Sequence, residues 1–224
     1  GSLTLFRVMD NYNCRTIVFS SSATIYEKNE NNHTLTEQSK INPTNPYGET
    51  KLAIEKILFN IFKGSTSKWR IANLRYFNPI GAHKSGLIGE NPLGIPNNIF
   101  PFLTQVGLKK IDHLEVFGND WDTPDGTGVR DYIHVMDLAE GHIAALDYLL
   151  KADKQNINLN LGTGIGTSVF QLINTFKKVN KLNLPFKVVG RREGDIGYVV
   201  ANNSFAKSLL NWKPSLNLED MCRD

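Results

Sequence analysis

Tyr47 and Lys51 stand four residues apart in the stretch Asn45–Lys51 and could act together in proton transfer. In a helix, side chains at i and i+4 lie one above the other on the same face. The pKa of a tyrosine hydroxyl is ordinarily about 10, but an ammonium within a few ångströms favours the phenolate. The pair is therefore a candidate general acid and base at neutral pH. Alternatively, Tyr47 packs at the helix start and Lys51 is solvated, and short motifs often match by chance.

The helix that would carry this pair has a recognisable start and a buried stripe. Asn45 suits the N-cap and Pro46 suits the first helical position. Apolar residues then recur at the spacing typical of one buried helical face: Ile54, Ile57, Leu58, Ile61 and Phe62. We expect a helix over residues 47–63.

A predicted strand lies on each side of this helix. Residues 15–19 are an apolar run typical of a strand buried on both faces, and residues 70–77 are a second strand. Residues 20–24 follow the first strand and are rich in hydroxyls, which could bind a sugar or a tyrosine or simply form a polar turn. Strand, helix and strand at these lengths predict a right-handed parallel unit. Its ligands would bind at the carboxyl ends of the strands, beside the start of the helix.

The rest of the chain alternates helices, strands and loops. Residues 80–98 are rich in Gly, Pro and Asn and predict a long loop, which in a compact domain is usually functional or mobile. Helices are expected in the first residues (from Leu5, Val8, Met9 and Tyr12) and over 99–107, 137–150, 204–210 and 216–224, with another capped by Thr167 or Ser168. Further strands are expected at 114–118, 129–135, 156–161 and 186–189.

Composition excludes several classes of function. The 224 residues carry a formal net charge of +3 without a basic run, which gives no reason to expect nucleic acid or a membrane as partner. Two cysteines near opposite ends argue against a disulfide framework and for a reducing, cytoplasmic setting. The five histidines show no metal-ligand spacing, so no metal is expected. The chain does not begin with Met, and both ends look cut.

The glycines at 162, 164 and 166 follow a predicted strand and precede a predicted helix, which is the setting of a dinucleotide fingerprint. The third glycine of that fingerprint would stand at position 167, which is Thr167. We therefore interpret this stretch as a structural turn.

Several longer motifs follow one another in order along the chain: Ser20–Thr24, the Tyr47/Lys51 pair, Arg75–His83, Gly94–Asn98, Val116–Asp120, Asp125–Val135 and Arg191–Asp195. Together they resemble the UDP-glucose 4-epimerases, a branch of the extended short-chain dehydrogenase/reductase family. The resemblance covers nearly the whole chain. It implies an α/β fold, with part of a doubly wound parallel (Rossmann-type) sheet and a smaller mixed α/β substrate domain.

The resemblance implies NAD-dependent interconversion of UDP-glucose and UDP-galactose by reversible oxidation at sugar C4. Tyr47 would exchange the proton of the 4-hydroxyl, and Ser22 would assist through a short hydrogen bond. Lys51 would hold the nicotinamide ribose and make Tyr47 a better base. The cofactor would also be contacted by Ser20 and Phe77.

By the same resemblance, the UDP-sugar would be held by Ser22, Thr24, Asn78, Asn98, Phe117, Arg130, Arg192 and Asp195. Their chemistry suits this role, since arginine offers forked donors to diphosphate oxygens. Phe117 offers a face to uracil, and Asp195 accepts from a ribose hydroxyl. The alternative for each arginine is a surface ion pair with the acidic residue that follows it.

Two departures from the family pattern have consequences. The Gly-rich phosphate loop and the ribose-binding acidic residue of the family have no counterpart in this sequence. We therefore expect that these 224 residues alone neither bind NAD tightly nor catalyse the reaction. We also expect them to expose an apolar sheet edge and helix faces. At the position that gates the sugar pocket, Val199 is small to intermediate, so UDP-N-acetylhexosamines are possible substrates of the intact protein.

The resemblance also suggests a division of the chain. Residues 1–79 would be the second half of the NAD-binding domain, and residues 80–224 mainly the UDP-sugar domain, with 129–150 returning to the first sheet. A homodimer is expected of the intact protein, with the helix over 47–63 as a candidate interface.

Two alternative functions remain. One is a nucleotide-sugar dehydratase or reductase of the same superfamily, and the other is a non-catalytic nucleotide-sugar binding module. Dehydratase chemistry usually needs an acidic pair beside the serine, and Ser22-Ala23-Thr24 has no acid.

Overall fold

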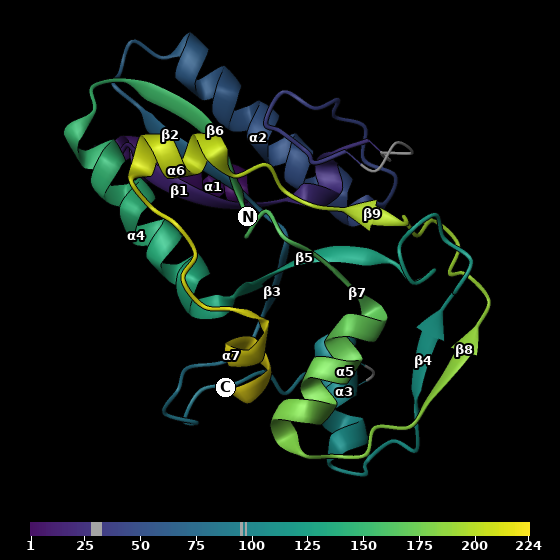
Figure 1. Ribbon diagram of the computed structural model, residues 1–224. Helices are drawn as coiled ribbons and strands as arrows, with labels where there is room; N and C mark the ends of the chain where they lie inside the picture. The colour runs from purple at the N-terminus through teal and green to yellow at the C-terminus, as the bar shows by residue number, and fades with distance from the viewer. Residues whose placement is uncertain (28–32, 95, 97) are drawn as a thin grey trace.

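A parallel sheet of three strands forms one layer of the computed structural model, which describes residues 1–27, 33–94, 96 and 98–224 (Figure 1). The strand order is β1 (Thr16–Ser22), β2 (Arg70–Tyr76) and β6 (Gln155–Leu161). In the register of β1 and β2, Ser22 lies opposite Tyr76. Both strands therefore end at the same rim of the sheet, as the sequence predicts.

Helices cover both faces of this sheet. Successive strand residues point to opposite faces. Ile17 and Ile71 pack with Leu58 of α2 (Pro46–Gly64), whereas Ala72 packs with Ala145 of α4 (Val135–Lys151). The doubly wound α/β arrangement is thereby confirmed.

The rest of the chain forms the smaller mixed α/β part. Strand β5 (Val129–His134) lies at the centre of a second sheet, parallel to β3 (Asn78–Ile80) and β9 (Tyr198–Val199) and antiparallel to β7 (Gly166–Ser168). A two-stranded parallel ribbon joins β4 (Leu114–Phe117) to β8 (Phe186–Val189).

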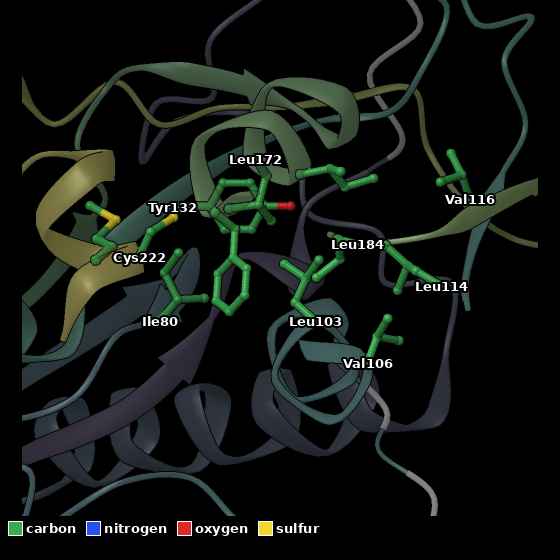
Figure 2. Close-up of a cluster of buried hydrophobic side chains, with 12 residues drawn as sticks. Ile80, Leu103, Val106, Leu114, Val116, Tyr132, Leu172, Leu184 and Cys222 are labelled. Atoms are coloured by element: carbon green, nitrogen blue, oxygen red, sulfur yellow. The ribbon is translucent and has the colours of Figure 1, made fainter. Parts of the chain in front are cut away.

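The core of this part lies among three helices, α3 (Ile99–Gly107), α5 (Val169–Asn180) and α7 (Leu218–Arg223). Figure 2 shows its side chains, including Leu103 of α3 and Leu172 of α5, both fully buried. Helix α6 (Ser204–Leu210) returns to the first sheet, where Ala206 is buried against it.

The structure corrects several predicted boundaries. Strand β1 continues through Ser22 because residues 20–22 pair with β2, and residues 16–19 are half-buried rather than buried. Helix α4 begins at Val135 because His134 caps it. Helix α7 begins at Leu218, with Asn217 as a side-chain cap that the sequence reading missed. The short strands β3, β7 and β9 were also missed, since two or three residues carry no periodicity.

Several apolar side chains are exposed together on each of α1 (Ser2–Asn11) and α4, in line with the expectation of exposed helix faces. On α1 the helix is confirmed, but only Phe6 is buried, and the exposed residues are Leu3, Leu5, Val8 and the adjoining Tyr12. On α4 the exposed stripe is Ile143, Leu146 and Leu150. Strand β1 is also an edge strand of its sheet among the described residues. In the part of the chain that the structure describes, no helix combines the length and apolarity of a membrane span.

Candidate functional site

Tyr47 lies in the first turn of α2, at the rim where β1 and β2 end. Asn45 caps this helix as predicted, because its Oδ1 accepts from the Gly48 amide at 2.8 Å. Gly48 lies so close to the preceding loop that a Cβ there would stand 2.6 Å from the Thr24 carbonyl oxygen. This contact places Tyr47, which is 55% exposed, beside the end of β1.

Lys51 reaches from α2 to the same strand. Its ammonium donates to the Ser20 carbonyl oxygen at 2.9 Å and lies 5.4 Å from the centre of the Tyr47 ring. The predicted pairing of the two side chains on one helix edge is therefore present. Since one hydrogen of Lys51 is used by the strand, two more can face a ligand at the rim.

The turn after β1 brings Ser22 and Thr24 together. The Ser22 hydroxyl oxygen accepts from the Thr24 amide at 3.2 Å and from the Thr24 hydroxyl at 3.0 Å. Ser22 is buried and caps the short 3-10 helix Ala23–Ile25. Because its oxygen accepts both bonds, the Ser22 proton is free to be donated.

Phe77 and Val199 belong to one apolar cluster beside this turn. Phe77 is buried, and Val199 is half-buried and packs against the same cluster, which includes Ala23, Leu52 and Ala201. The predicted sugar-pocket position, Val199, therefore lies in the cluster that also contains the predicted cofactor contact.

A cavity of about 670 Å³ opens in the smaller part of the chain. Six of the eight residues that the resemblance assigns to the UDP-sugar line it, namely Asn78, Asn98, Phe117, Arg130, Arg192 and Asp195, whereas Ser22 and Thr24 do not. Asn98 stands at the N-cap of α3 without using its side chain as a cap, which leaves its amide available to a ligand. The neighbouring Ile95 and Asn97 of the predicted motif lie outside the described residues.

Within the cavity, Arg130 pairs with a partner that is distant in sequence. Its Nη2 donates to Asp195 Oδ1 at 2.5 Å. The next residue, Asp131, points to the opposite face of β5 and is fully buried. The alternative of a surface pair between these two neighbours is therefore wrong, because adjacent strand residues face opposite sides.

Arg192 stacks on an aromatic ring. Its guanidinium carbon lies 4.2 Å from the centre of the Phe117 ring. A planar guanidinium on an aromatic face is a favourable cation–π arrangement. The Phe117 ring, which the resemblance assigns to uracil, is thus in contact with Arg192 of the same cavity.

The glycines at 162 and 164 belong to a turn around a carboxylate. Asp131 accepts from the amides of Thr163 and Gly164 at 2.7 and 2.9 Å and from the Thr163 hydroxyl at 2.6 Å. A Cβ at Gly162 would stand 2.6 Å from the same carboxylate. The amides that could have bound a phosphate serve Asp131, which supports the structural interpretation of this stretch.

Sequence reasoning missed a buried charged network beneath Tyr47. Arg75 donates to both carboxylate oxygens of Glu55, at 3.1 and 2.8 Å, and Ser21 donates to the same carboxylate at 2.5 Å. Burial raises the pKa of Tyr26 to about 12, so its hydroxyl stays protonated and donates to Asn160 at 2.6 Å. The signal was present, since Glu55 interrupts an apolar helix face two turns after Tyr47.

A second missed group faces α4. The Tyr76 hydroxyl lies 2.6 Å from the Ser20 hydroxyl and also contacts His142 Nε2. His142 Nδ1 donates to the Leu138 carbonyl oxygen at 2.8 Å, because a carbonyl oxygen only accepts. Burial raises the pKa of Tyr76, so it remains a neutral hydroxyl that braces the ends of β1 and β2.

This fold and this rim define a class of protein. Residues 1–162 match the NAD dependent epimerase/dehydratase family, and the chain belongs to that family.

Individual relatives are similar over the whole chain. It is 52% identical over 227 residues to UDP-glucose 4-epimerase 2 of Arabidopsis thaliana, covering 100% of this chain and 63% of that protein. It is also similar to the UDP-glucose-4-epimerase of Stenotrophomonas maltophila, whose crystal structure holds NAD and formylated UDP-arabinopyranose. There the identity is 44% and the TM-score 0.96, over 100% of this chain and 66% of that one.

A third similar protein is the UDP-glucose 4-epimerase of Bifidobacterium longum, in complex with NAD⁺ and UDP. The identity is 43% and the TM-score 0.92, over 99% of this chain and 65% of that one. The chain therefore spans slightly less than two thirds of the length of these three proteins.

Proposed function

We propose that this chain forms the catalytic rim and the nucleotide pocket of an NAD-dependent UDP-hexose 4-epimerase, an isomerase that interconverts UDP-glucose and UDP-galactose. One observation carries the proposal: six side chains from separate segments, to which the resemblance assigns the UDP part of the ligand, line one cavity. The named relatives, which are UDP-glucose 4-epimerases, support the same activity.

The residues at the rim fit the nicotinamide end of the cofactor. Lys51 has two ammonium hydrogens available for a ribose, and Tyr47 is an exposed residue of α2. When bound, NAD would supply a reversible electron acceptor for sugar C4. We assign its contacts to Tyr47, Lys51, Phe77 and Ser20.

The proton chemistry falls to the side chains of the rim. Tyr47 would take the proton of the 4-hydroxyl and return it after the sugar has turned. Lys51 would favour the phenolate form through its positive charge. Ser22, with its proton free, would donate to the same oxygen, and Thr24 would contact the hexose. Val199 would border the hexose on the side of the Phe77 cluster.

The nucleotide end would be held by charge. Arg130 and Arg192 would bind the diphosphate as forked donors, Asp195 would accept from the ribose, and Asn78, Asn98 and Phe117 would complete the pocket. In the present structure Arg130 is bound to Asp195. A diphosphate would therefore share the Arg130 guanidinium with that carboxylate.

We further propose the division into residues 1–79 and 80–224, with 129–150 returning to the first sheet. Its support is that α4, residues 135–151, packs on β1 and β2. Residues 129–134 form β5 and pair within the second sheet, so within 129–150 it is α4 that returns to the first sheet. The intact protein would be a cytoplasmic homodimer. Both cysteines, Cys14 and Cys222, are free thiols, and α2 exposes Phe59 at 46%.

The test uses the full-length protein, purified without added cofactor. We expect bound NAD, and conversion of UDP-galactose to UDP-glucose. In Tyr47→Phe, conversion should be lost while NAD stays bound, because the ring is kept and only the hydroxyl is removed.

Other outcomes would point to the other candidate functions. Bound NAD without conversion would favour a dehydratase or reductase of the same superfamily. Neither NAD nor conversion would favour a nucleotide-sugar binding module.

A further inference from the structure

Two segments border the nucleotide cavity, residues 117–128 and residues 189–197, and Trp121 of the first contacts Arg191 of the second. Its indole N–H donates to the Phe117 carbonyl oxygen at 3.4 Å, and its backbone N–H donates to the Gly126 carbonyl oxygen at 2.9 Å. Its ring lies 3.9 Å from the guanidinium carbon of Arg191. The half-buried ring is thus bonded to the first segment and stacked on the second.

Arg191 is held a second time by the first segment. Its Nε donates to Asp120 Oδ1 at 2.8 Å, and its Nη2 donates to the Asp120 carbonyl oxygen at 2.5 Å. Stacking and two hydrogen bonds fix the guanidinium plane, although the side chain is 43% exposed. A lone surface ion pair would hold the Arg191 guanidinium less firmly, because fixing two flexible exposed side chains costs entropy.

Two glycines make this close packing possible. A Cβ at Gly197 would stand 2.9 Å from the Trp121 ring. Gly118 has a positive φ of 80°, and a Cβ there would stand 2.8 Å from Arg191 Cγ and 2.9 Å from Trp121 Nε1. Side chains at these positions would push the two segments apart.

The residue after Arg191 is Arg192, which stacks on Phe117 inside the cavity. Phe117 is also the residue whose carbonyl oxygen receives the Trp121 bond. Trp121 and Arg191 are absent from the residues that line the cavity. They therefore hold the backbone on both sides of the Arg192–Phe117 contact from outside.

We propose that Trp121 and Arg191 form a clamp that aims Arg192 into the cavity, and so are positioning residues for a diphosphate-bearing ligand. The proposal rests on the nucleotide binding proposed above. Because Phe117 is also held by the pairing of β4 with β8, loss of the clamp should act mainly on the Arg192 guanidinium. Binding of a nucleoside diphosphate should depend on the clamp, whereas binding of the nucleoside alone should not.

The experiment uses the full-length protein, because the 224-residue chain alone exposes apolar side chains on α1 and α4. Dissociation constants for UDP and for uridine would be measured by calorimetry and by NMR titration. In Trp121→Ala and in Arg191→Gln, UDP binding should weaken about tenfold while uridine binding stays within about twofold. Trp121→Phe keeps a ring face for Arg191 and should retain most of the UDP affinity. The control Tyr12→Ala removes an 81% exposed ring just after α1 and should change neither constant.

A double-mutant cycle tests whether the clamp affects UDP binding by positioning Arg192. In an Arg192→Ala background, adding Arg191→Gln should weaken UDP binding no further, since the side chain that the clamp aims is gone. Arg191→Gln also serves if Trp121→Ala fails to fold, because Arg191 is partly exposed. Equal losses for UDP and uridine, unchanged UDP binding, or full additivity with Arg192→Ala would each overturn the clamp.

The proposed function fails in a different way. A wild-type chain that binds neither UDP nor uridine would refute the nucleotide pocket, and the clamp with it. A wild-type chain that binds UDP, with variants that show no selective loss, would refute the clamp alone.

Discussion

Gly48 lies against the carbonyl oxygen of Thr24, with room for a hydrogen but not for a methyl group. A Cβ would stand 2.6 Å from that oxygen and 2.9 Å from Pro43 Cβ. This contact brings the first turn of α2, which carries Tyr47, onto the turn that carries Ser22. The distance between the proposed base and the proposed hydroxyl partner is therefore set by a residue that does no chemistry.

Gly48→Ala should push the first turn of α2 away from Thr24. Overpacking of this kind costs about 1–3 kcal/mol, to be measured by urea unfolding of the chain. Gly64→Ala, at the other end of the same helix, meets nothing within 4 Å and should stabilise by about 0.5–1 kcal/mol. Equal stability of the two variants would contradict the close contact.

Glu55→Ala should lower the stability of the chain, because it leaves the charge of Arg75 buried without its partner. The Glu55 and Arg75 side chains are 7% and 1% exposed. Removing one partner of a buried ion pair costs about 3–5 kcal/mol. The double variant with Arg75→Met should cost less than the sum of the single changes, since it leaves no unpaired charge. As a control, Asp153→Ala breaks the exposed pair with Lys68 and should leave the urea midpoint unchanged. Additive single and double changes would show that the pair is not coupled.

Asp125 should make stability depend on acid pH. Burial raises its pKa, but hydrogen bonds from Ser168 and Thr127 outweigh burial and leave the pKa below the usual aspartate value. A lowered folded pKa gives stability that is present above the unfolded pKa and lost as pH falls through the folded value. The stability difference between wild type and Asp125→Asn should therefore shrink below about pH 4. Urea unfolding from pH 7 to 3 measures it, and a constant difference would contradict the assignment.

The two thiols should differ in reactivity. Cys14 is exposed and Cys222 is buried. Burial raises the pKa of Cys222 to about 12, so almost none of it is thiolate at neutral pH. A thiol-exchange reagent at pH 8 should modify one cysteine in the native chain and two in urea. Cys14→Ser should abolish the native reaction, and a remaining fast reaction would show that α7 opens readily.

Val199 should decide whether N-acetyl sugars are accepted by the full-length protein. It packs beside Phe77 and is smaller than an aromatic residue. We expect turnover of UDP-N-acetylglucosamine, which Val199→Tyr should abolish while UDP-galactose is still converted. Val188→Tyr, on the exposed strand β8, is the matched control. No product from UDP-N-acetylglucosamine with the wild type would refute this specificity.

The sequence by itself determined the elements and the rim. Regular elements carry periodic signals, so α2, β2 and α3 lie where the pattern predicts them. Strand, helix and strand order brings Ser22 and Tyr47 to one edge, because parallel strands end together.

Only the tertiary structure decided which charged groups meet. Arg130 binds Asp195, 65 residues away, rather than its neighbour Asp131. Glu55 meets Arg75 in the core, and Trp121 meets Arg191 across two loops. Local pattern shows which face of an element a residue occupies. The partner on that face is brought there by chain folding over long sequence separations, and no local periodicity encodes it.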